Sequence, residues 1–599
     1  MVVKMKKYLF LVFHRDYLNF LKQLRSCGVV HVTRKKSDDL EPSPEMADLK
    51  QYITRLHKAI RFLRPRAENP VKPSQSIHVE TILSNLEAKQ QAYEKARHDL
   101  ALLQKEIALA EPWGEFDSQT AQKLAEQNIK IRFFKCSGKK FQSNWENEFH
   151  LAVINQTKNY IFFVVFERPD KTANFSCEEV FLPDAPLSQL QHRYNELQQK
   201  IPQIEQEFTQ IANESLTILE TAISKAMQEV DFNEVQQSAE AIAEDTLLIL
   251  AGWVPADRQQ ELEQMLKEAQ CVAVEVDPEP DEHPPIVLKN GYFARLFEPI
   301  ARMFSLPDYT ELDLTAAFAP FFTLFFGLCL GDAGYGVLIL LGTFIARFYV
   351  KEELKPIMTL GMVLGFSTTV VGILTGTIFG VWLTMTESAQ LQKLVILGNP
   401  EQIFYLALII GVVQILFGII IQMLNRIRQF GFPAGLSPLG WFILILSLVG
   451  IMLKGTHQNE LISQITAKTI WVGIGLILLF NDMKANIFVR LGKGLWELYN
   501  ITGFFGDVLS YVRLFALGIS SAILGLVINS IASQMQGIPW IGPVLFILIL
   551  LIGHTANILL SGLGAFVHPM RLTFVEFYKN AGFKGGGKPY KPFVLSESK

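Results

Sequence analysis

Arg513 is the residue in this sequence whose type and setting point most directly to chemistry. It lies in a strongly apolar stretch, between Val508 and Leu517. A guanidinium does not lose its proton at physiological pH, and placing one in hydrocarbon costs at least about 2.5–3.5 kcal/mol on insertion scales. Because so costly a charge is kept when it faces a partner charge or a water path, we predict that Arg513 is a functional charge inside a membrane.

Polar residues gather on one face of each of the last two apolar segments. The first face carries Ser510, Arg513, Leu517, Ser520, Ser521 and Leu524, with Gly518 and Gly525 close to it. The second face carries His554, Asn557, Ser561, Gly564, Ala565, His568, Arg571 and Leu572. Spacings of three, four and seven residues place each set on one side of a helix.

Two interpretations of these faces remain open. Small residues let helix backbones approach, and Ser or Asn can hydrogen-bond across the contact, so the faces could be packing surfaces or could line a water path. For His554 and His568 we favour a hydrogen-bonded structural role over proton relay. Arg513 lies about halfway along its predicted helix, so it cannot reach an end by snorkelling. For Arg571, nearer a helix end, snorkelling or a salt bridge remains an alternative. Asp507 falls on a different face from Arg513.

The sequence shows no site for a nucleotide, a metal or another cofactor. Residues 582–589, GFKGGGKP, have the spacing of a phosphate loop, but Pro589 replaces the required Ser or Thr and the segment follows a membrane helix. We therefore predict a flexible cytosolic tail there. The net charge of −3 suggests no nucleic-acid partner. The cysteines lack metal spacing and are predicted to be reduced thiols; they are Cys27, Cys136, Cys177, Cys271 and Cys329.

The composition of the chain changes near residue 310. Its 599 residues are 49% hydrophobic, which is too apolar for a wholly soluble protein. Eight apolar segments follow, at about 315–330, 333–350, 357–383, 402–424, 438–453, 469–489, 496–534 and 540–577. The first two meet at Gly331-Asp332 and are predicted to form a hairpin at one surface. The last two are longer than a span needs, so they must tilt strongly or project.

The distribution of positive charge predicts the orientation of these segments. With the N-terminal half in the cytoplasm, thirteen Lys and Arg residues fall on the inner side and three on the outer side, which supports eight spans and two cytoplasmic termini. The inner residues are Arg347, Lys351, Lys355, Arg426, Arg428, Lys484, Arg490, Lys493, Lys579, Lys584, Lys588, Lys591 and Lys599; the outer ones are Lys393, Lys454 and Lys468.

The predicted fold is mixed: α+β lobes joined by an antiparallel coiled coil, then an all-α polytopic membrane domain of eight helices whose last two are long and tilted. Residues 1–310 form the soluble part. Within it we expect a proximal α/β lobe from 1–40 and 240–285, coiled-coil arms at about 45–110 and 186–235, and a distal lobe at about 111–185. The membrane domain is predicted at 311–580, with a tail at 581–599.

The second arm carries the clearer coiled-coil pattern. Its apolar residues alternate in steps of three and four, as a coiled-coil seam does: Leu187, Leu190, Tyr194, Leu197, Ile201, Ile204, Phe208 and Ile211. Pro202 lies inside the seam and should bend it. Packing of both arms in an ordinary globular core remains the alternative.

Three signatures in the membrane half resemble the a subunit, also called subunit I, of V-type and A-type rotary ATPases. Residues 319–336, with Ala319-Pro320-Phe321-Phe322 and Gly331-Asp332-Ala333-Gly334-Tyr335-Gly336, are similar to the family's first membrane signature. Residues 507–517 resemble its arginine helix, and residues 564–593 its C-terminal signature. The soluble half has the family's layout of two lobes joined by a coiled coil. The resemblance covers the whole chain.

The resemblance implies a stator subunit of a bacterial or archaeal cell membrane that translocates protons or sodium ions and hydrolyses no nucleotide itself. Arg513 would be the essential arginine facing the rotating c-ring of proteolipid subunits, and Arg571 the second arginine of that interface. Further implied partners are the peripheral stalk E and G subunits, the central-stalk d/C subunit region and membrane lipid.

Two positions depart from the eukaryotic relatives. Ser561 stands where those relatives have a glutamate ten residues before the second arginine, and Ser521 where they have a histidine eight residues after the first. The acids of the half-channels must therefore come from elsewhere, or the corresponding groups must be neutral. Glu497, with Tyr499 beside it, is a candidate at the outer mouth, or else an interfacial helix-start residue. Glu576 is an inner-side candidate, or else a surface charge.

Two other functions are possible for a chain with this pattern. A secondary transporter would typically show two related halves with broken helices, but we find no internal repeat, and 300 soluble residues before the first span are unusual. A membrane-anchored scaffold without transport would tolerate replacement of Arg513.

Overall fold

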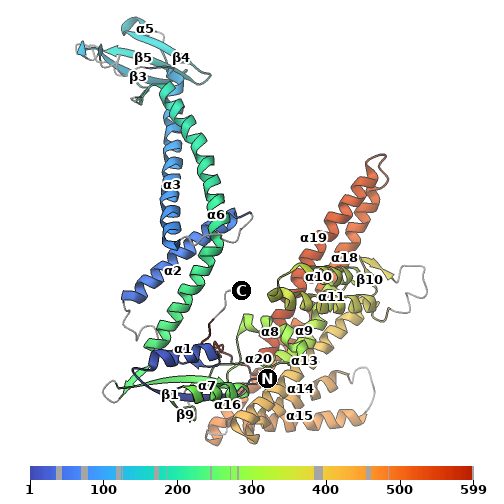
Figure 1. Cartoon of the computed structure of the whole chain (residues 1–599). Helices are drawn as coiled ribbons and strands as arrows, with labels where there is room; N and C mark the ends of the chain where they lie inside the picture. Colours follow the sequence, from blue (N-terminus) through green and yellow to red (C-terminus); the bar gives the residue numbers. More distant parts are fainter. Residues whose placement is uncertain are drawn as a thin grey trace. The chain divides into compact units, whose positions relative to one another are not determined.

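The computed structural model describes residues 1–34, 44–68, 78–116, 123–124, 126–142, 144–167, 175–183, 185–242, 246–269, 271–279, 282–383, 395–453, 460–482 and 485–595. The chain forms two compact units (Figure 1). The first comprises Met1–Thr33 and Ala239–Val594, and the second is mainly Arg34–Ser238. Of the charges used to predict orientation, Lys393, Lys454, Lys484 and Lys599 lie outside the described residues.

A small lobe opens the first unit, built from both ends of the predicted soluble half. Its elements are β1(Met5–Phe13), α1(Tyr17–Cys27), β2(His31–Val32), β7(Glu240–Ile242), β8(Leu247–Pro255), α7(Gln259–Glu268) and β9(Cys271–Val276). The strands form one sheet in the order β2-β8-β1-β9, with β7 beside β8, and all pairs are antiparallel. Phe10 of β1 packs on Phe20 of α1, and both are buried.

The second unit is a pair of long helices that ends in a second sheet (Figure 1). Its helices are α2(Pro44–Leu63), α3(Val79–Ala110), α5(Trp145–Glu148) and α6(Leu187–Gln237). The sheet contains β3(Lys130–Ser137), β4(Leu151–Gln156), β5(Tyr160–Glu167) and β6(Glu178–Val180), in the antiparallel order β4-β5-β3-β6. Leu83 and Leu86 of α3 share a core with Ile204 and Phe208 of α6, so predicted seam residues face a partner helix. Pro202 lies inside α6, as expected; knobs-into-holes geometry stays a prediction.

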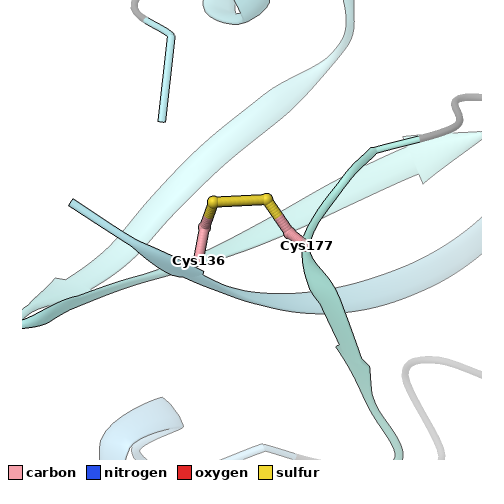
Figure 2. Close-up of a disulfide and its surroundings, with 2 residues drawn as sticks. All are labelled: Cys136 and Cys177. Atoms are coloured by element: carbon pink, nitrogen blue, oxygen red, sulfur yellow. A yellow bond between two sulfur atoms is a disulfide. The ribbon is translucent and has the colours of Figure 1, made fainter. Parts of the chain in front are cut away.

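A disulfide joins Cys136 and Cys177 in this second sheet (Figure 2), so the prediction of five free thiols is wrong for these two residues. Lys135 of β3 pairs with Glu178 of β6, and the next residues along the two antiparallel strands are the cysteines. Their Cα atoms are 4.9 Å apart, which is within disulfide range. Their sequence separation of 41 hides this proximity. The other three cysteines are free thiols.

The rest of the first unit is helical. Its elements are α8(Tyr292–Phe304), α9(Thr315–Leu330), α10(Ala333–Tyr349), α11(Lys355–Thr375), α13(Pro400–Phe430), α14(Leu436–Leu453), α15(Glu460–Phe480), α16(Ile487–Tyr499), α17(Ile501–Ser510), α18(Val512–Met535), α19(Gly542–Arg571), a π-helix at Leu572–Phe577 and α20(Tyr578–Asn580). Among the described residues, five helical stretches are long and apolar enough to cross a membrane: Glu352–Thr375, Pro400–Phe430, Phe432–Ile451, Ile487–Met535 and Gly542–Asn580. Three apolar helices are shorter, Thr315–Leu330, Ala333–Tyr349 and Thr466–Phe480. The count of eight spans therefore stays a prediction.

Three of the predicted apolar segments end or break earlier than expected. The segment at 357–383 stops at Thr375, where Gly376 adopts a left-handed φ of 77°, and a small hairpin of β10(Thr377–Ile378) and β11(Val381–Trp382) follows. The segment at 469–489 stops at Phe480. The long segment at 496–534 is not one helix, because α17 ends at Ser510 and α18 begins at Val512.

The two C-terminal helices are the least covered part of this helical body. Only 6% of the most apolar stretch of Gly542–Asn580 and 22% of that of Ile487–Met535 are buried inside the chain, against 33–39% for the other three candidate spans. In Figure 1, α18 and α19 form a pair whose connecting turn projects past α10 and α11. A large apolar surface of this kind marks contact with lipid or another protein.

The predicted flexible tail is instead bound to the first lobe. Phe593 donates its N–H to Val30 and is 2% exposed, and Tyr590 donates its hydroxyl to the Val29 carbonyl. The N–H groups of Lys584 and Gly585 donate to the carboxylate of Glu311, at 2.8 and 3.1 Å. Gly585 and Gly586 have φ values of 71° and 88°, so the glycines serve a specific turn. The end of the helical body that carries this tail and the lobe is called the lobe end below.

Candidate functional site

Arg513 lies in the first turn of α18, directly after a break in the helix. The amide of Tyr511 donates to Val508 at 3.1 Å and that of Leu514 to Tyr511 at 3.0 Å, so both bonds close tight three-residue turns. Arg513 therefore lies at the start of a helix. Its central position in the apolar segment had instead predicted a place in the middle of one. Its Nη1 atom is buried and has no hydrogen-bond partner in the described part of the chain. A buried donor of this kind calls for a partner, and no described residue has an acceptor within hydrogen-bond distance of it.

A cluster of polar side chains lies beside Arg513 on its lobe-end side. This lobe-end cluster consists of Asp507, Ser510, Glu576, Lys579 and Asn580. Asp507 accepts from the side chains of Lys579 at 3.2 Å and Asn580 at 3.0 Å, so it is satisfied within the chain. Ser510 donates its hydroxyl to the Gly506 carbonyl at 3.0 Å, and Glu576 lies within electrostatic reach of both Arg513 and Arg571. The cluster thus joins the end of α17 to the end of the last long helix.

Glu576 is 2% exposed and its Oε2 atom has no partner among the described residues, so it is not the surface charge that remained an alternative. The π-helix at Leu572–Phe577 explains its direction. In an α-helix, residues five apart are about 140° apart around the axis, at 100° per residue. Because a π-helix closes i→i+5 bonds, it brings Glu576 closer to the face of Arg571. Arg571 itself is exposed, and His568 lies within electrostatic reach of both arginines.

A second cluster lies farther along α18 and α19, on the other side of Arg513. This far-end cluster consists of Asp332, Tyr335, Asn529, His554, Asn557 and Ser561. Tyr335 joins its hydroxyl to His554 Nδ1 at 2.7 Å, and Asn557 Nδ2 donates to that hydroxyl at 2.8 Å. Ser561 donates to Asn557 Oδ1 at 2.8 Å, and His554 Nε2 meets Asn529 Oδ1 at 3.0 Å. Three of the sequence-predicted residues therefore belong to one continuous hydrogen-bonded chain.

Asp332 holds the far-end cluster to the small hairpin. Its carboxylate is fully buried and accepts backbone N–H bonds from Tyr335 at 3.1 Å, Phe379 at 2.9 Å and Gly380 at 2.8 Å. These donors satisfy a charged group that would otherwise be costly to bury. Gly380 packs so closely on Gly525 of α18 that a Cβ atom on it would lie 2.3 Å from that backbone. The predicted packing role of small residues on α18 therefore holds at Gly525.

The remaining predicted serines take different positions. Ser521 is buried; its carbonyl accepts from Asn557 Nδ2 at 3.1 Å, and its hydroxyl has no partner in the described residues. Ser520 is exposed on α18.

Glu497 and Tyr499 lie apart from both clusters. They belong to the short helix α16, and Glu497 lies within electrostatic reach of Arg426, near the C-terminal end of α13. That end of α13 is the lobe end, because Gln422 contacts Gly582 of the tail. In the predicted orientation the lobe end faces the cytoplasm, so this position does not agree with the predicted outer mouth, and the role of Glu497 stays a prediction. The structure shows that α16 is a separate helix that precedes α17 and α18. With Lys493 and Trp496 it lines a cavity of about 520 Å³.

Sequence reasoning missed Asp332, Tyr335 and Asn529 as site residues. Asn529 is an amide inside an apolar helix, and Asp332 is a carboxylate between two apolar segments. Each is a polar group in a setting where burial demands a partner, which is the signal that could have identified them. Tyr335 gave no such signal. No group of three or more His, Cys, Asp or Glu side chains that could hold a metal ion occurs within the described ranges.

The backbone N–H groups of the tail are engaged within the chain. In phosphate loops, successive backbone N–H groups hold the anion. Here the N–H groups of Lys584 and Gly585 already hold the buried carboxylate of Glu311. The phosphate-loop spacing of residues 582–589 therefore serves an internal turn.

Comparison with known proteins gives a consistent result. A model described as the V-type ATPase 116kDa subunit family matches residues 170–364. The V-type ATP synthase subunit I of Borreliella burgdorferi is 27% identical over 623 residues, which cover 99% of both chains. The A-type ATP synthase subunit I of Methanocaldococcus jannaschii is 30% identical over 390 residues, covering 58% of this chain and 55% of that protein.

More distant relatives and one solved structure also match. The V-type ATP synthase subunit I 1 of Treponema pallidum is 23% identical over 634 residues, or 99% of this chain and all of that protein. A crystal structure of the cytoplasmic N-terminal domain of subunit I, homolog of subunit a, of V-ATPase covers 45% of this chain and 100% of that one. The TM-score is 0.24 and the sequence identity is 16%.

Proposed function

The chain belongs to the V-type ATPase 116 kDa subunit family, and on this premise we propose that it is the stator and ion-translocating membrane subunit of a V/A-type rotary ATPase. In this role it provides two half-channels and the arginine that faces a ring of c subunits. Transport of protons or sodium ions through it is coupled to ring rotation and to ATP hydrolysis or synthesis on other subunits.

The observation that carries the proposal is the unpaired Nη1 atom of Arg513. It lies on α18, which together with α19 is the least covered part of the helical body. A charged donor that is buried without an acceptor costs several kcal/mol unless a partner is supplied. The residue as a whole is only half-buried, and a carboxylate on another membrane subunit would pair with its guanidinium from the surface that this chain leaves uncovered.

The two polar clusters support a divided path. Along α18 and α19, the lobe-end cluster and the far-end cluster lie on opposite sides of Arg513. We assign the lobe-end cluster, through Glu576 and Ser510, to the half-channel that opens to the cytoplasm. The far-end cluster, through His554, Asn557 and Ser561, belongs to the half-channel that opens to the other side, with Ser521 and His568 on the same helices.

Arg513 couples these half-channels through electrostatics. A ring carboxyl is neutral while it faces lipid, because burial disfavours the charged form, and it ionises beside a fixed guanidinium. The guanidinium cannot pass a proton on, so direct leakage between the half-channels is blocked and rotation is the remaining route. Each charge that crosses is worth about 2.3 kcal/mol per 100 mV, so several ions are needed for each ATP.

The same role predicts location and partners. The protein is expected in the cell membrane of a bacterium or archaeon, with both termini in the cytoplasm. Its helical second unit would dock the peripheral stalk E and G subunits, and the first lobe would lie near the central-stalk d/C subunit region. The ring subunits and lipid cover α18 and α19.

Substitution of Arg513 tests the proposal. Arg513→Ala and Arg513→Lys are each expected to abolish ATP-driven ion pumping in liposomes, with the complex assembled. Lysine is informative because it keeps a charge but can titrate when desolvated. Arg490→Lys is the matched control, because Arg490 caps α15 through the Leu479 and Asp482 carbonyls. Pumping at the wild-type rate in both Arg513 variants would reject the proposal and favour a scaffold. Solute counterflow by this chain alone would favour a secondary transporter.

A further inference from the structure

We propose that His554 is the proton-accepting group of the far-end half-channel, and that two backbone carbonyls fix its neutral tautomer through the amides of Asn529 and Asn557. The inference rests on the proposed function, because it assigns roles within that half-channel. The evidence for it is the pattern of donors and acceptors in the hydrogen bonds of the far-end cluster.

The first carbonyl belongs to Phe379. A carbonyl oxygen can only accept, so the bond of 2.7 Å from Asn529 to it must use the amide nitrogen Nδ2. The Asn529 Oδ1 atom then faces His554 Nε2 at 3.0 Å and also can only accept. Nε2 therefore carries the hydrogen. A neutral imidazole has one N–H, so Nδ1 is left as an acceptor.

The second carbonyl leads to the same assignment from the other end. Asn557 Nδ2 donates to the Ser521 carbonyl at 3.1 Å, which fixes the orientation of that amide. Its second hydrogen goes to the Tyr335 oxygen at 2.8 Å. The Tyr335 hydroxyl keeps its own hydrogen to donate, and His554 Nδ1 lies 2.7 Å away. The two ends agree on the tautomer of the neutral ring, which carries its hydrogen on Nε2.

The turn that supplies the first carbonyl is built at a conformational cost. Phe379 and Gly380 form the two-residue turn of the hairpin, with φ values of 49° and 74°. Such turns favour Asn-Gly, and a phenylalanine there is strained. Asp332 holds the turn through the Phe379 and Gly380 amides, and the Phe379 ring contacts His554 at a centroid distance of 5.8 Å. Strain that is retained at such a position is typical of functional sites.

Among the side chains of this hydrogen-bonded cluster, His554 is the group that can take up a proton. Asn529, Asn557 and Ser561 do not titrate near neutral pH, and the Asp332 carboxylate is occupied by three N–H donors. An arriving proton binds the lone pair of His554 Nδ1, and the Tyr335 hydroxyl rotates from donor to acceptor. Tyr335 and Asn529 are thus positioning residues. Asp332 is the charged group of the cluster that acts electrostatically on His554.

The test reads the tautomer directly in the assembled complex. Solid-state NMR of complexes with ¹⁵N-histidine-labelled subunit, assigned by subtracting a His554→Gln spectrum, should show the neutral form with hydrogen on Nε2. Because both ends fix it, Asn529→Leu and Tyr335→Phe should each keep this tautomer, whereas the double variant should give a mixture. Phe379→Asn, which suits the turn and keeps the carbonyl, should leave it unchanged. Ser530→Leu, at the next and exposed position of α18, is the control.

Pumping provides the second readout. His554→Gln should lower ATP-driven pumping at least about tenfold, whereas His98→Gln, on α3 of the second unit, should not. A hydrogen on Nδ1 in the wild-type protein, or an unchanged tautomer in the double variant, would overturn the positioning of His554. If the wild-type protein shows the predicted tautomer but His554→Gln pumps at the wild-type rate, the role of His554 as proton acceptor is overturned. Neither result depends on whether Arg513→Lys pumps, so failure of the proposed function is distinguishable.

Discussion

Tyr511 donates a 2.6 Å hydrogen bond from its hydroxyl to Oε1 of Gln414, and both side chains are fully buried. The bond joins the break between α17 and α18 to α13, which lies 97 residues earlier in the chain. The ring of Tyr511 also covers Gly411, where a Cβ atom would lie 2.5 Å from it. The turn that aims Arg513 is therefore anchored by a residue on another helix.

Removal of the Tyr511 hydroxyl should destabilise this anchor. In Tyr511→Phe, the buried Gln414 amide loses its recorded side-chain partner, which should cost about 1–3 kcal/mol. Gln414→Leu in the same background should restore most of that loss, because both polar groups are then gone. Thermal unfolding of the purified subunit in the two single variants and the double variant measures the coupling. Additive losses in the double variant would show that the two residues do not act as a pair.

Glu576 should matter more for pumping than Asp507, although both are carboxylates of the lobe-end cluster. Glu576 is buried with Oε2 unpaired, whereas Asp507 already holds Lys579 and Asn580. Glu576→Gln removes the group that could exchange a proton and should slow ATP-driven pumping at least about tenfold. Asp507→Asn is the matched control and should have a smaller effect, and Glu576→Asp should retain part of the activity. Equal rates in Glu576→Gln and the wild type would remove Glu576 from the path.

Asp313 should make the attachment of the N-terminus sensitive to acid. Burial by itself raises the pKa of this carboxyl, but hydrogen bonds from Thr315 and Asn290 and the charge of the Met1 ammonium outweigh burial, so its pKa lies below the ordinary value. A depressed folded-state pKa means that the unfolded chain binds the proton first on acidification. The stability from Asp313 is thus complete above the unfolded pKa of about 3.9 and is lost as pH falls through the lower folded value.

Comparison with Asp313→Asn measures this contribution. The difference in unfolding temperature between the wild type and the variant should be constant above about pH 5 and should shrink below about pH 4. Asp308→Asn is a suitable control on the same connecting segment. A difference that stays constant down to pH 2 would contradict the predicted role of Asp313.

The disulfide should contribute to the stability of the second sheet. Digestion without reductant should yield a peptide pair linked through Cys136 and Cys177, with Cys27, Cys271 and Cys329 recovered as thiols. The variant with both Cys136→Ser and Cys177→Ser should lose about 2–4 kcal/mol. The free energies of unfolding of the oxidised and the reduced wild-type protein should differ by a similar amount. The comparison matters because cytosolic thiols are kept reduced. Recovery of all five thiols from air-oxidised protein would contradict the pairing.

The sequence predicted much of the helical architecture because apolar runs and their periodicity are local signals. The ranges of α9 and α10 agree with the structure to within a residue. The break at Tyr511 was missed because no Gly or Pro marks it; it depends on Gln414, far away in sequence. The tail was misread for a related reason: a run of glycines looks flexible until Glu311 and Val30 are placed beside it.

The candidate site shows the same division. His554, Asn557 and Ser561 could be grouped from helical spacing alone. Their partners Tyr335, Asn529 and Phe379 lie on other elements, and the role of Phe379 depends on its backbone carbonyl rather than on its side chain. Such contacts have no local signal. The cysteine pair was likewise hidden, because the antiparallel pairing of β3 with β6 brings the two residues together.

The central claim is that Arg513 faces a carboxyl on a separate ring subunit, and cross-linking tests it most directly. In the assembled complex, Arg513→Cys combined with Cys in place of the ring carboxyl should form an intersubunit disulfide on mild oxidation. Cys at Arg490, at the cap of α15, should form none with the same ring position. Efficient cross-linking at position 513 alone is the predicted result. Its absence in an assembled complex, with equal reactivity of both cysteines toward a small thiol reagent, would contradict the account.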